Sequence, residues 1–377
     1  MSRASCYDVV IIGGGVMGCS IAWRLAQEKQ RVLVLERSVP GAEASSAAAG
    51  MLVPHAEAHG DNPMTRLMMK SAARFPKLST ELQNATGMDV EYRRSGALRV
   101  AFTARQGKEL KRPSWASRAK VQQKSFSSAG LSKLESSLAK LHSGVLYPKD
   151  ARIDPRLFLR STHLAALRSG AEFRSGTYVE CIEQRAKKAE AVRLEDGTRI
   201  MAGTVVVAAG SWSALVEGVP LQRQDVIPAR GQVIELTSSS PLTDRVIFGP
   251  DCYAVPRDDG RILIGSTTEF VGHRRGVTAR AARDLLTAAI ALMPALGDAR
   301  LTGSWSNFRP FAADGLPVLG KTGVDGLLLA TGHYRTGILL APITAEIIRC
   351  LILGKRSPVP LASFSSSRLA RSSPLSK

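Results

Sequence analysis

The sequence predicts an α/β protein of two domains: a dinucleotide-binding domain on a parallel sheet, and an α+β domain on an antiparallel sheet. Three observations lead to this prediction. A strand, a glycine turn, a helix and a second strand open the chain, and short strands separated by polar turns occupy residues 226–267. A second strand–glycine–helix unit lies at residues 327–342. Because the two units bracket the antiparallel region, the first domain is expected to be discontinuous.

The first forty residues contain the most specific local pattern. An apolar, β-branched run at residues 7–12 ends at glycines spaced Gly-x-Gly-x-x-Gly, which are Gly13, Gly15 and Gly18. In such a turn the glycines allow a tight bend, close approach of a pyrophosphate and close packing of the next helix. The strand that follows ends at Glu36, where this motif places an acceptor for a ribose hydroxyl. The pattern predicts a Rossmann-like dinucleotide site without deciding which dinucleotide binds.

Composition limits the class of protein. The chain has 377 residues, of which 44% are hydrophobic, enough for a large core. No apolar run approaches the roughly 18 residues that span a membrane, and the N-terminus lacks the pattern of a signal peptide. The five cysteines form no Cys-x-x-Cys pair, and the six histidines have no zinc-like spacing. We therefore expect a cytoplasmic protein without a metal site.

The net charge of +19 would suit a nucleic-acid-binding protein, but equally one with solvated basic segments. More than half of this charge lies in residues 103–125 and in the Ser-rich segment from Lys355 onward. Neither segment carries an RNA-binding signature or a basic strand interleaved with aromatic residues. We expect no specific nucleic-acid site, a disordered basic tail at residues 366–377, and a dispensable segment after Lys355.

Two runs of small residues are suited to contact with a flat ligand. Residues 41–55 are rich in alanine and glycine, and Ser45 and Ser46 offer hydroxyl groups, although an Ala-rich structural helix is the alternative. Residues 204–212 form an apolar strand that ends in small residues, with a plain turn as the alternative. The unit at residues 327–342 is expected to bring another helix N-terminus near the dinucleotide.

The antiparallel region contains two candidates for anion binding. Tyr253 opens a predicted strand in a sheet that could wall a pocket. Arg309 lies between Phe308 and Pro310, and an isolated arginine is most often a surface residue. Its apolar flanks favour instead a guanidinium that reaches into a protected site and binds an anion.

Four segments together resemble a known family. They are Val-Val-Ile-Ile-Gly-Gly-Gly-Val-Met-Gly at residues 9–18, Ala-Ser-Ser-Ala-Ala-Ala-Gly-Met at 44–51, Val-Val-Ala-Ala-Gly-Ser-Trp-Ser at 206–213 and Gly-His-Tyr-Arg-Thr-Gly-Ile-Leu-Leu-Ala-Pro at 332–342. The sequence resembles the FAD-dependent D-amino-acid oxidase/sarcosine oxidase superfamily, most closely the glycine oxidases of thiamine biosynthesis (ThiO-type). The resemblance implies a D-amino-acid-oxidase-like fold. The domain ranges we expect are 1–85, 145–215 and 320–365 for FAD binding, and 86–144 and 216–319 for substrate binding.

The resemblance also implies roles for individual residues. Glu36 would hold the adenosine ribose, Val179 would lie beside the adenine, and residues 45–51 and 335–338 would surround the isoalloxazine. The residues expected to contact FAD are Gly13, Gly15, Val16, Met17, Gly18, Glu36, Arg37, Ser45, Ser46, Ala49, Gly50, Met51, Val179, Ala209, Gly210, Trp212, His333, Arg335, Thr336, Gly337 and Ile338.

By the same resemblance, Tyr253 and Arg309 would hold a substrate carboxylate, with Arg335 close by. Thr336 stands where the family pattern has Asn, and Thr268 stands where a bulkier Met is expected, which bears on the size of the pocket. The sarcosine-oxidase branch has a flavin-facing Lys and a flavin-linking Cys. The corresponding positions here carry neither residue, so we expect FAD to bind noncovalently.

These implications predict an enzyme that oxidises glycine or a similar small amino acid to the imine, with O2 reduced to H2O2. The imine would hydrolyse to glyoxylate and ammonia, or supply thiazole synthase in thiamine biosynthesis, and a homo-oligomer is expected. One alternative is an oxidoreductase that acts on a carboxymethylaminomethyl-modified tRNA uridine. Others are a sarcosine or D-amino-acid oxidase or dehydrogenase, and a non-catalytic flavoprotein.

Overall fold

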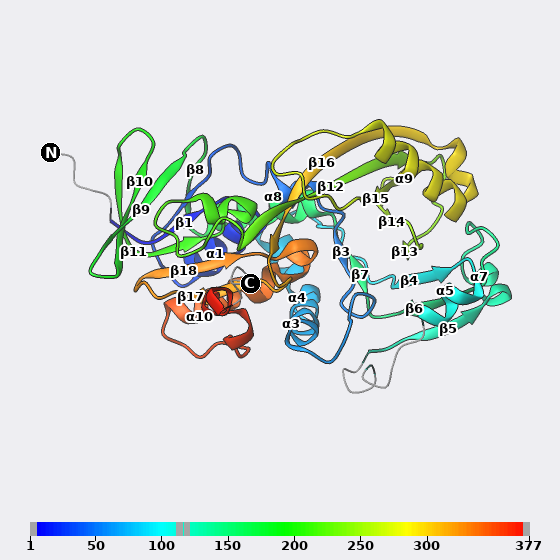
Figure 1. Cartoon of the computed structure of the whole chain (residues 1–377), viewed down its shortest axis with the longest axis horizontal. Coiled ribbons are helices and arrows are strands. Elements are labelled where there is room, and N and C mark those ends of the chain that lie inside the picture. Colours follow the sequence, from blue (N-terminus) through cyan, green and yellow to red (C-terminus); the bar gives the residue numbers. More distant parts are fainter. Residues whose placement is uncertain (1–5, 111–115, 117–120, 372–377) are drawn as a thin grey trace, which may run out of the picture.

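The computed structural model describes residues 6–110, 116 and 121–371. Two large sheets lie toward opposite ends of an elongated molecule (Figure 1). The first sheet takes its strands from residues 6–35, 172–207 and 318–331, and the second from residues 97–147 and 226–312. The chain therefore passes from the first sheet to the second and back twice, which agrees with the predicted fold class.

The first sheet has the order β17-β18-β11-β1-β2-β8, and β10 and β9 extend it from β11. Its centre is parallel, while β17 and β10 pair antiparallel with their neighbours. The strands are β1 (Cys6–Ile12), β2 (Val32–Leu35), β8 (Glu172–Arg174), β9 (Val179–Arg185), β10 (Lys188–Leu194), β11 (Arg199–Val207), β17 (Val318–Lys321) and β18 (Leu327–Thr331). A hairpin through Asp196 and Gly197 joins β10 to β11.

The continuous apolar run in β1 is explained by burial of both faces. Val9 and Ile11 pack into one core with the helices, whereas Val10 and Ile12 pack into a second core on the opposite face. The helices of the first core are α1 (Val16–Gln27), α3 (Pro63–Ala72), α4 (Phe75–Thr86), α8 (Pro155–Arg168) and α10 (Gly337–Ile352). Helix α8 begins at Pro155, because the Asp154 carboxylate accepts from two backbone N–H groups of its first turn.

The second sheet has the order β16-β12-β15-β14-β13-β4-β6-β5, and all its pairs are antiparallel except that of β13 with β4. The strands are β4 (Ala97–Ala101), β5 (Lys124–Ser127), β6 (Ser143–Tyr147), β12 (Val226–Thr237), β13 (Val246–Phe248), β14 (Tyr253–Pro256), β15 (Arg261–Gly265) and β16 (Arg300–Ala312). Helix α9 (Ala279–Leu292) packs on one face. The other face carries Val233, Tyr253 and Leu263 against Ala49 and Val53, which places the second sheet beside the segment after β2.

Short elements complete the described part. They are α2 (Ala44–Ala47), β3 (Met51–Leu52), α5 (Ala104–Glu109), α7 (Ser128–Leu134), β7 (Ala151–Arg152), η1 (Gly210–Leu215), η2 (Pro294–Asp298), η3 (Tyr334–Thr336), η4 (Ala362–Phe364) and η5 (Ser366–Arg371). None of the helices in the described ranges is both long and apolar enough to cross a membrane. Much of the basic stretch, at residues 111–115 and 117–120, lies outside these ranges.

The structure changes two expected boundaries, the domain boundary at residue 145 and the start of the disordered tail at residue 366. The predicted boundary at residue 145 would cut β6, which pairs entirely within the second sheet, so the domain assignment that we propose moves this boundary past Tyr147. The predicted disordered tail is wrong for residues 366–371, which form η5. Leu369 is buried there, and Arg368 forms an ion pair with Asp314. Residues 372–377 lie outside the described part.

The segment after Lys355 was predicted to be dispensable, and the structure argues against this prediction. Val359 and Phe364 are buried in the core that also holds α1 and α10. Isolated apolar residues in a Ser- and Arg-rich segment gave no periodic signal, and the contact that buries them is tertiary.

Candidate active site

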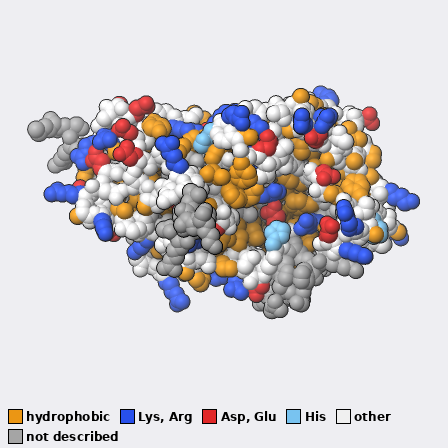
Figure 2. Space-filling model, viewed as in Figure 1, with side chains coloured by type: hydrophobic (Ala, Val, Ile, Leu, Met, Phe, Trp, Pro, Cys, Tyr) orange, Lys and Arg blue, Asp and Glu red, His pale blue; other side chains and the backbone are white. Residues whose placement is uncertain are grey.

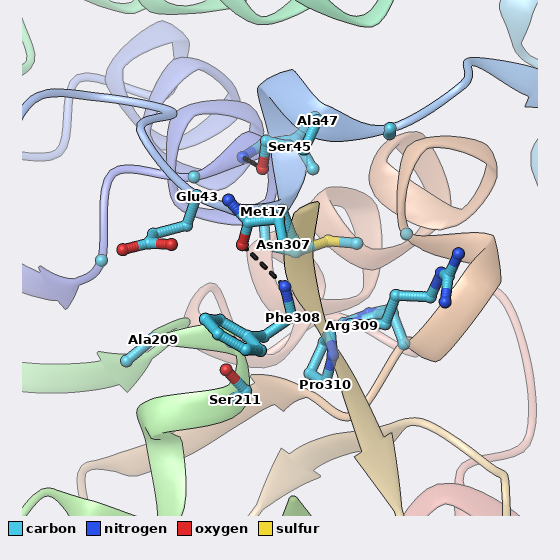
Figure 3. A pocket seen from close by; sticks show the side chains of 18 of the residues that line it. Met17, Glu43, Ser45, Ala47, Ala209, Ser211, Asn307, Phe308, Arg309 and Pro310 are labelled. Atoms are coloured by element: carbon cyan, nitrogen blue, oxygen red, sulfur yellow. Dashed lines mark hydrogen bonds between the residues drawn. The ribbon is translucent and has the colours of Figure 1, made fainter. Parts of the chain in front are cut away.

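A pocket lies between the two sheets, where the C-terminal ends of β1, β11 and β18 face β12, β14 and β16. Figure 2 shows apolar side chains gathered in the middle of the molecule. In Figure 3, Glu43 and Arg309 lie on opposite sides of the pocket, with Met17, Asn307 and Phe308 between them. The pocket therefore has one end beside Glu43, in the segment after β2, and another at Arg309 on β16.

The glycine turn brings backbone close together after β1. Gly13 has a φ of +107°, which L-residues rarely adopt, and a β-carbon there would overlap with the Ala208 carbonyl. A β-carbon on Gly18 would overlap with the Gly13 carbonyl, so Gly18 allows α1 to pack against the turn. Ser45 Oγ accepts from the Val16 N–H at 2.9 Å, at the first residue of α1.

Glu36 is held rigidly at the end of β2. It is 8% exposed; its Oε2 accepts from the Gly14 N–H at 2.8 Å, and its Oε1 accepts from the Ser38 N–H at 2.9 Å. Each carboxylate oxygen can accept a further hydrogen bond. Glu36 also lines the pocket, so it can bind a hydroxyl group there.

A cluster from both sheets borders the same end of the pocket. The Arg37 guanidinium lies 3.9 Å from the centre of the Trp212 ring, and the His273 ring stacks on Trp212 with 4.5 Å between the ring centres. His273 Nε2 lies 3.2 Å from Ser211 Oγ. Arg37 and Arg275 both pair with the Glu43 carboxylate, at 2.7 and 2.5 Å. The segment around residue 273 thus ties the second sheet to the first at the pocket.

The opposite end of the pocket is formed by Tyr253 on β14 and Arg309 on β16. Each packs over a glycine: a β-carbon on Gly265 would overlap with the Tyr253 hydroxyl, and one on Gly231 would overlap with the Arg309 guanidinium. Arg309 Nη1 donates to the Thr267 carbonyl at 3.0 Å, and Nη2 donates to Ser266 Oγ at 2.6 Å.

The charge of Arg309 is not balanced by a carboxylate. In the described part of the chain no Asp or Glu forms an ion pair with it. Burial lowers the pKa of Arg309, and Tyr253 raises it. A positive charge in a partly buried site without a partner favours an anionic ligand.

The second strand–glycine–helix unit adds a third wall. Helix α10 begins at Gly337, which lines the pocket together with Arg335 and Ile338. Arg335 Nε lies 3.9 Å from Glu57 Oε1. His333 is buried, its Nε2 lies 3.0 Å from Thr344 Oγ1, and burial lowers its pKa to about 3, so its ring is neutral at physiological pH.

Comparison with known proteins agrees with this geometry. The family model for FAD-dependent oxidoreductases (DAO) matches residues 8–351. The chain belongs to this family. It is 33% identical to glycine oxidase from Geobacillus kaustophilus, and the match covers 96% of this chain and 97% of that protein. The crystal structure of glycine oxidase from this species superposes with a TM-score of 0.92 at 32% identity, covering 96% of this chain and 98% of that one.

Two further members differ in informative ways. The bifunctional protein ThiO/ThiG of Synechocystis is 37% identical over 96% of this chain, which spans about half (54%) of that longer protein. Iminodiacetate oxidase from Chelativorans superposes with a TM-score of 0.87 at 28% identity, covering 95% of this chain and 98% of that one.

The pocket of this FAD-dependent oxidoreductase fits its cofactor. The glycine turn allows a ligand to approach the backbone closely, and the positive end of the α1 dipole suits a pyrophosphate. Glu36 retains acceptor capacity for a ribose, and the small residues from Ala47 to Gly50 leave a flat wall. The four cysteines whose side chains are described, including Cys19 beside the turn, are buried and do not line the pocket.

Most of the predicted residues meet at this pocket. Those that line it are Gly13, Gly15, Val16, Met17, Glu36, Arg37, Ser45, Ala49, Gly50, Met51, Val179, Ala209, Gly210, Trp212, Tyr253, Arg309, His333, Arg335, Gly337 and Ile338. Gly18, Ser46 and Thr336 are not among the lining residues, and the predicted contacts with FAD stay predictions. Gly18 packs against the turn, the Ser46 carbonyl accepts from Arg156 Nε, and the Thr336 hydroxyl donates to the His333 carbonyl.

Sequence reasoning missed Glu43, Glu57, His273 and Ser266. Glu43 and Glu57 lie within or just after the small-residue run, so their positions were visible, but nothing local distinguishes them from surface acids. Ser266 lines the pocket, and His273 stacks on the lining residue Trp212; both positions depend on contacts between distant segments, for which the sequence holds no local signal.

Proposed function

We propose that this chain oxidises glycine or a similar small amino acid to the corresponding imine, using noncovalently bound FAD. The observation that carries the proposal is Arg309, a partly buried guanidinium that forms no ion pair with any acid of the described residues. It lies beside Tyr253 in the pocket that holds the dinucleotide motif. Glycine oxidase relatives support the same substrate class.

Arg309 and Tyr253 would orient the substrate. The guanidinium can take the carboxylate through two N–H groups, and the Tyr253 hydroxyl, 6% exposed as a residue, can donate a further hydrogen bond. A carboxylate fixed at this end would hold the adjacent Cα within the pocket that Ala49 and Gly50 also line. FAD, when bound, supplies the acceptor for the hydride from Cα. We assign no side-chain base.

The N-terminus of α10 complements this arrangement. Gly337 and Ile338, its first residues, line the pocket, and a helix N-terminus stabilises negative charge that develops beside it. Arg335, with Glu57 beside it, lies at the same wall. The protein would thus hold a carboxylate at one place and favour negative charge on the cofactor at another.

The products of the proposed reaction follow from its electron balance. The amino acid loses the Cα hydride and an amine proton, and O2 takes up two electrons and two protons to give H2O2. The imine then hydrolyses to glyoxylate and ammonia, or passes to a thiazole synthase for thiamine formation; the ThiO/ThiG relatives support the second route. A cytoplasmic homo-oligomer without specific nucleic-acid binding is part of the same proposal.

A peroxide-release screen on the purified holoenzyme tests the proposal. Glycine, sarcosine, D-alanine and D-proline are compared under air, and absorbance of the flavin is followed under anaerobic conditions. Turnover of glycine with peroxide release is the expected result. Anaerobic bleaching without peroxide under air would indicate a dehydrogenase, and no bleaching with any of the four amines would contradict the proposed substrate class.

A further inference from the structure

A second arginine in the pocket, Arg335, differs from Arg309 in one respect: it has an acidic neighbour. Glu57 Oε1 lies 3.9 Å from Arg335 Nε. The Glu57 side chain is 21% exposed and that of Arg335 is 36% exposed. Both residues line the pocket with Arg309 and Tyr253. Glu57 belongs to the turn after β3, where its N–H donates to the Val53 carbonyl at 3.0 Å.

The electrostatic surroundings of Glu57 are dominated by arginines. Burial raises the pKa of Glu57, and Arg335, Arg99 and Arg309, in this order, oppose the rise. Arg99 is not a lining residue; its Nη1 donates to the Ala56 carbonyl. Glu57 is therefore the acid that offsets the positive charge at this end of the pocket.

We propose that Glu57 restricts the site to substrates with a single carboxylate by neutralising Arg335. This inference rests on the proposed function. Of the two arginines that line this end, Arg335 faces Glu57, whereas Arg309 forms no ion pair with an acid of the described residues. One substrate carboxylate can pair with Arg309. A second carboxylate near Arg335 would lie beside the Glu57 carboxylate, and two like charges in a partly buried site repel each other. Without Glu57, two arginines would be available for two carboxylates.

Ligand binding tests the inference without any turnover. Oxydiacetate carries two carboxylates and methoxyacetate carries one, and neither has an amine to be oxidised. Their dissociation constants are measured by calorimetry on the FAD-loaded wild type, Glu57→Gln, Glu57→Asp and the double variant Glu57→Gln/Arg335→Ala. The expected result is that Glu57→Gln shifts the preference toward oxydiacetate by at least tenfold. Glu57→Asp keeps the charge and stays near the wild-type preference, and the double variant loses the gain.

Kinetics provide the second readout, as the ratio of kcat/KM for iminodiacetate to that for glycine. Glu57→Gln is expected to raise this ratio at least tenfold, mainly through a lower KM for iminodiacetate. An unchanged ratio would overturn the inference, and so would equal losses for both substrates, because these would place Glu57 on the amine that the substrates share. A gain that survives Arg335→Ala would also overturn it. Failure of the proposed function can be distinguished from failure of this inference. If the proposed function is wrong, the wild type oxidises neither glycine nor iminodiacetate, but the dissociation constants of oxydiacetate and methoxyacetate can still be compared.

Discussion

The Arg309 guanidinium lies so close to the α-carbon of Gly231 that no β-carbon could be added there without overlap. In the register of β12 and β16, Arg309 is opposite Ala229, so its side chain reaches diagonally across the sheet to Gly231. Gly231 is therefore required for the position of the proposed carboxylate anchor, independent of any special backbone conformation.

Gly231→Ala is expected to displace the guanidinium and to lower kcat/KM for glycine by more than tenfold while FAD stays bound. The control is Gly303→Ala on the paired strand β16, where an added β-carbon meets its nearest neighbours at 3.6 Å, an ordinary contact. Flavin absorbance reports cofactor content and steady-state assays report kcat/KM. Normal turnover in Gly231→Ala would show that the guanidinium need not occupy this position.

Arg309→Ala is expected to lower kcat/KM for amino acids far more than Tyr253→Phe. A hydrogen bond to a charged group contributes roughly 1.5–3 kcal/mol, which corresponds to roughly ten- to over a hundredfold. Removal of Arg309 also removes the fork that orients the substrate, whereas removal of the Tyr253 hydroxyl leaves the ion pair in place. Stopped-flow absorbance under anaerobic conditions, together with benzoate titration, measures both effects. If Arg309→Ala reduces its flavin at the wild-type rate and with the wild-type dependence on amino-acid concentration, Arg309 does not bind the carboxylate, and Arg335 becomes the next candidate.

Local patterns predicted the parts of the site that are contiguous in sequence. The turn through Gly13 to Gly18 and the acid at Glu36 follow from strand burial and glycine spacing, and the structure brings them together as expected. Tyr253 and Arg309 were identified by residue type and family resemblance. The packing of these two side chains over Gly265 and Gly231 was not predicted. A glycine at the start or end of an apolar run is typical of an ordinary strand boundary, so neither glycine indicated a close contact.

Contacts between distant segments were not predictable in the same way. The pairing of Arg275 with Glu43 and the stacking of His273 on Trp212 depend on how the second sheet docks on the first. The C-terminal segment is a similar case. Its composition is that of a disordered tail, yet Phe364 is buried because the core beneath α10 accepts it. Burial of single apolar residues depends on tertiary packing, not on local composition.

Phe364→Ala is expected to lower the free energy of unfolding by about 3–5 kcal/mol, the usual effect of truncating a buried phenylalanine. Phe364 is only 2% exposed in the core shared with α10. The control is Ser363→Ala, the preceding residue of η4, which is expected to change stability by less than about 0.5 kcal/mol. Urea unfolding of the holoenzyme, followed by circular dichroism, measures both. Equal stability of the two variants would mean that the segment from Lys355 is dispensable after all.

His333 is expected to make the protein less stable at acid pH. Its pKa is about 3 in the folded protein because the ring is buried, whereas the ordinary value is 6.5. Well above pH 6.5 the ring is neutral in both states and contributes no pH dependence. As the pH falls from 6.5 toward 3, the unfolded chain binds a proton that the folded protein does not, so the free energy of unfolding decreases by up to about 1.4 kcal/mol per pH unit.

Carboxylates titrate in the same range, so the test compares wild type with His333→Gln, which cannot bind this proton. The difference in unfolding free energy, wild type minus variant, should shrink steadily between pH 7 and pH 4.5. The variant also loses the contact between His333 Nε2 and Thr344 Oγ1, which are 3.0 Å apart. This loss changes the free energy of unfolding by the same amount at every pH, so it does not alter the pH dependence of the difference. Urea unfolding at half-unit pH steps gives the difference directly. A difference that stays constant over this range would show that His333 is protonated alike in both states, and that burial does not lower its pKa.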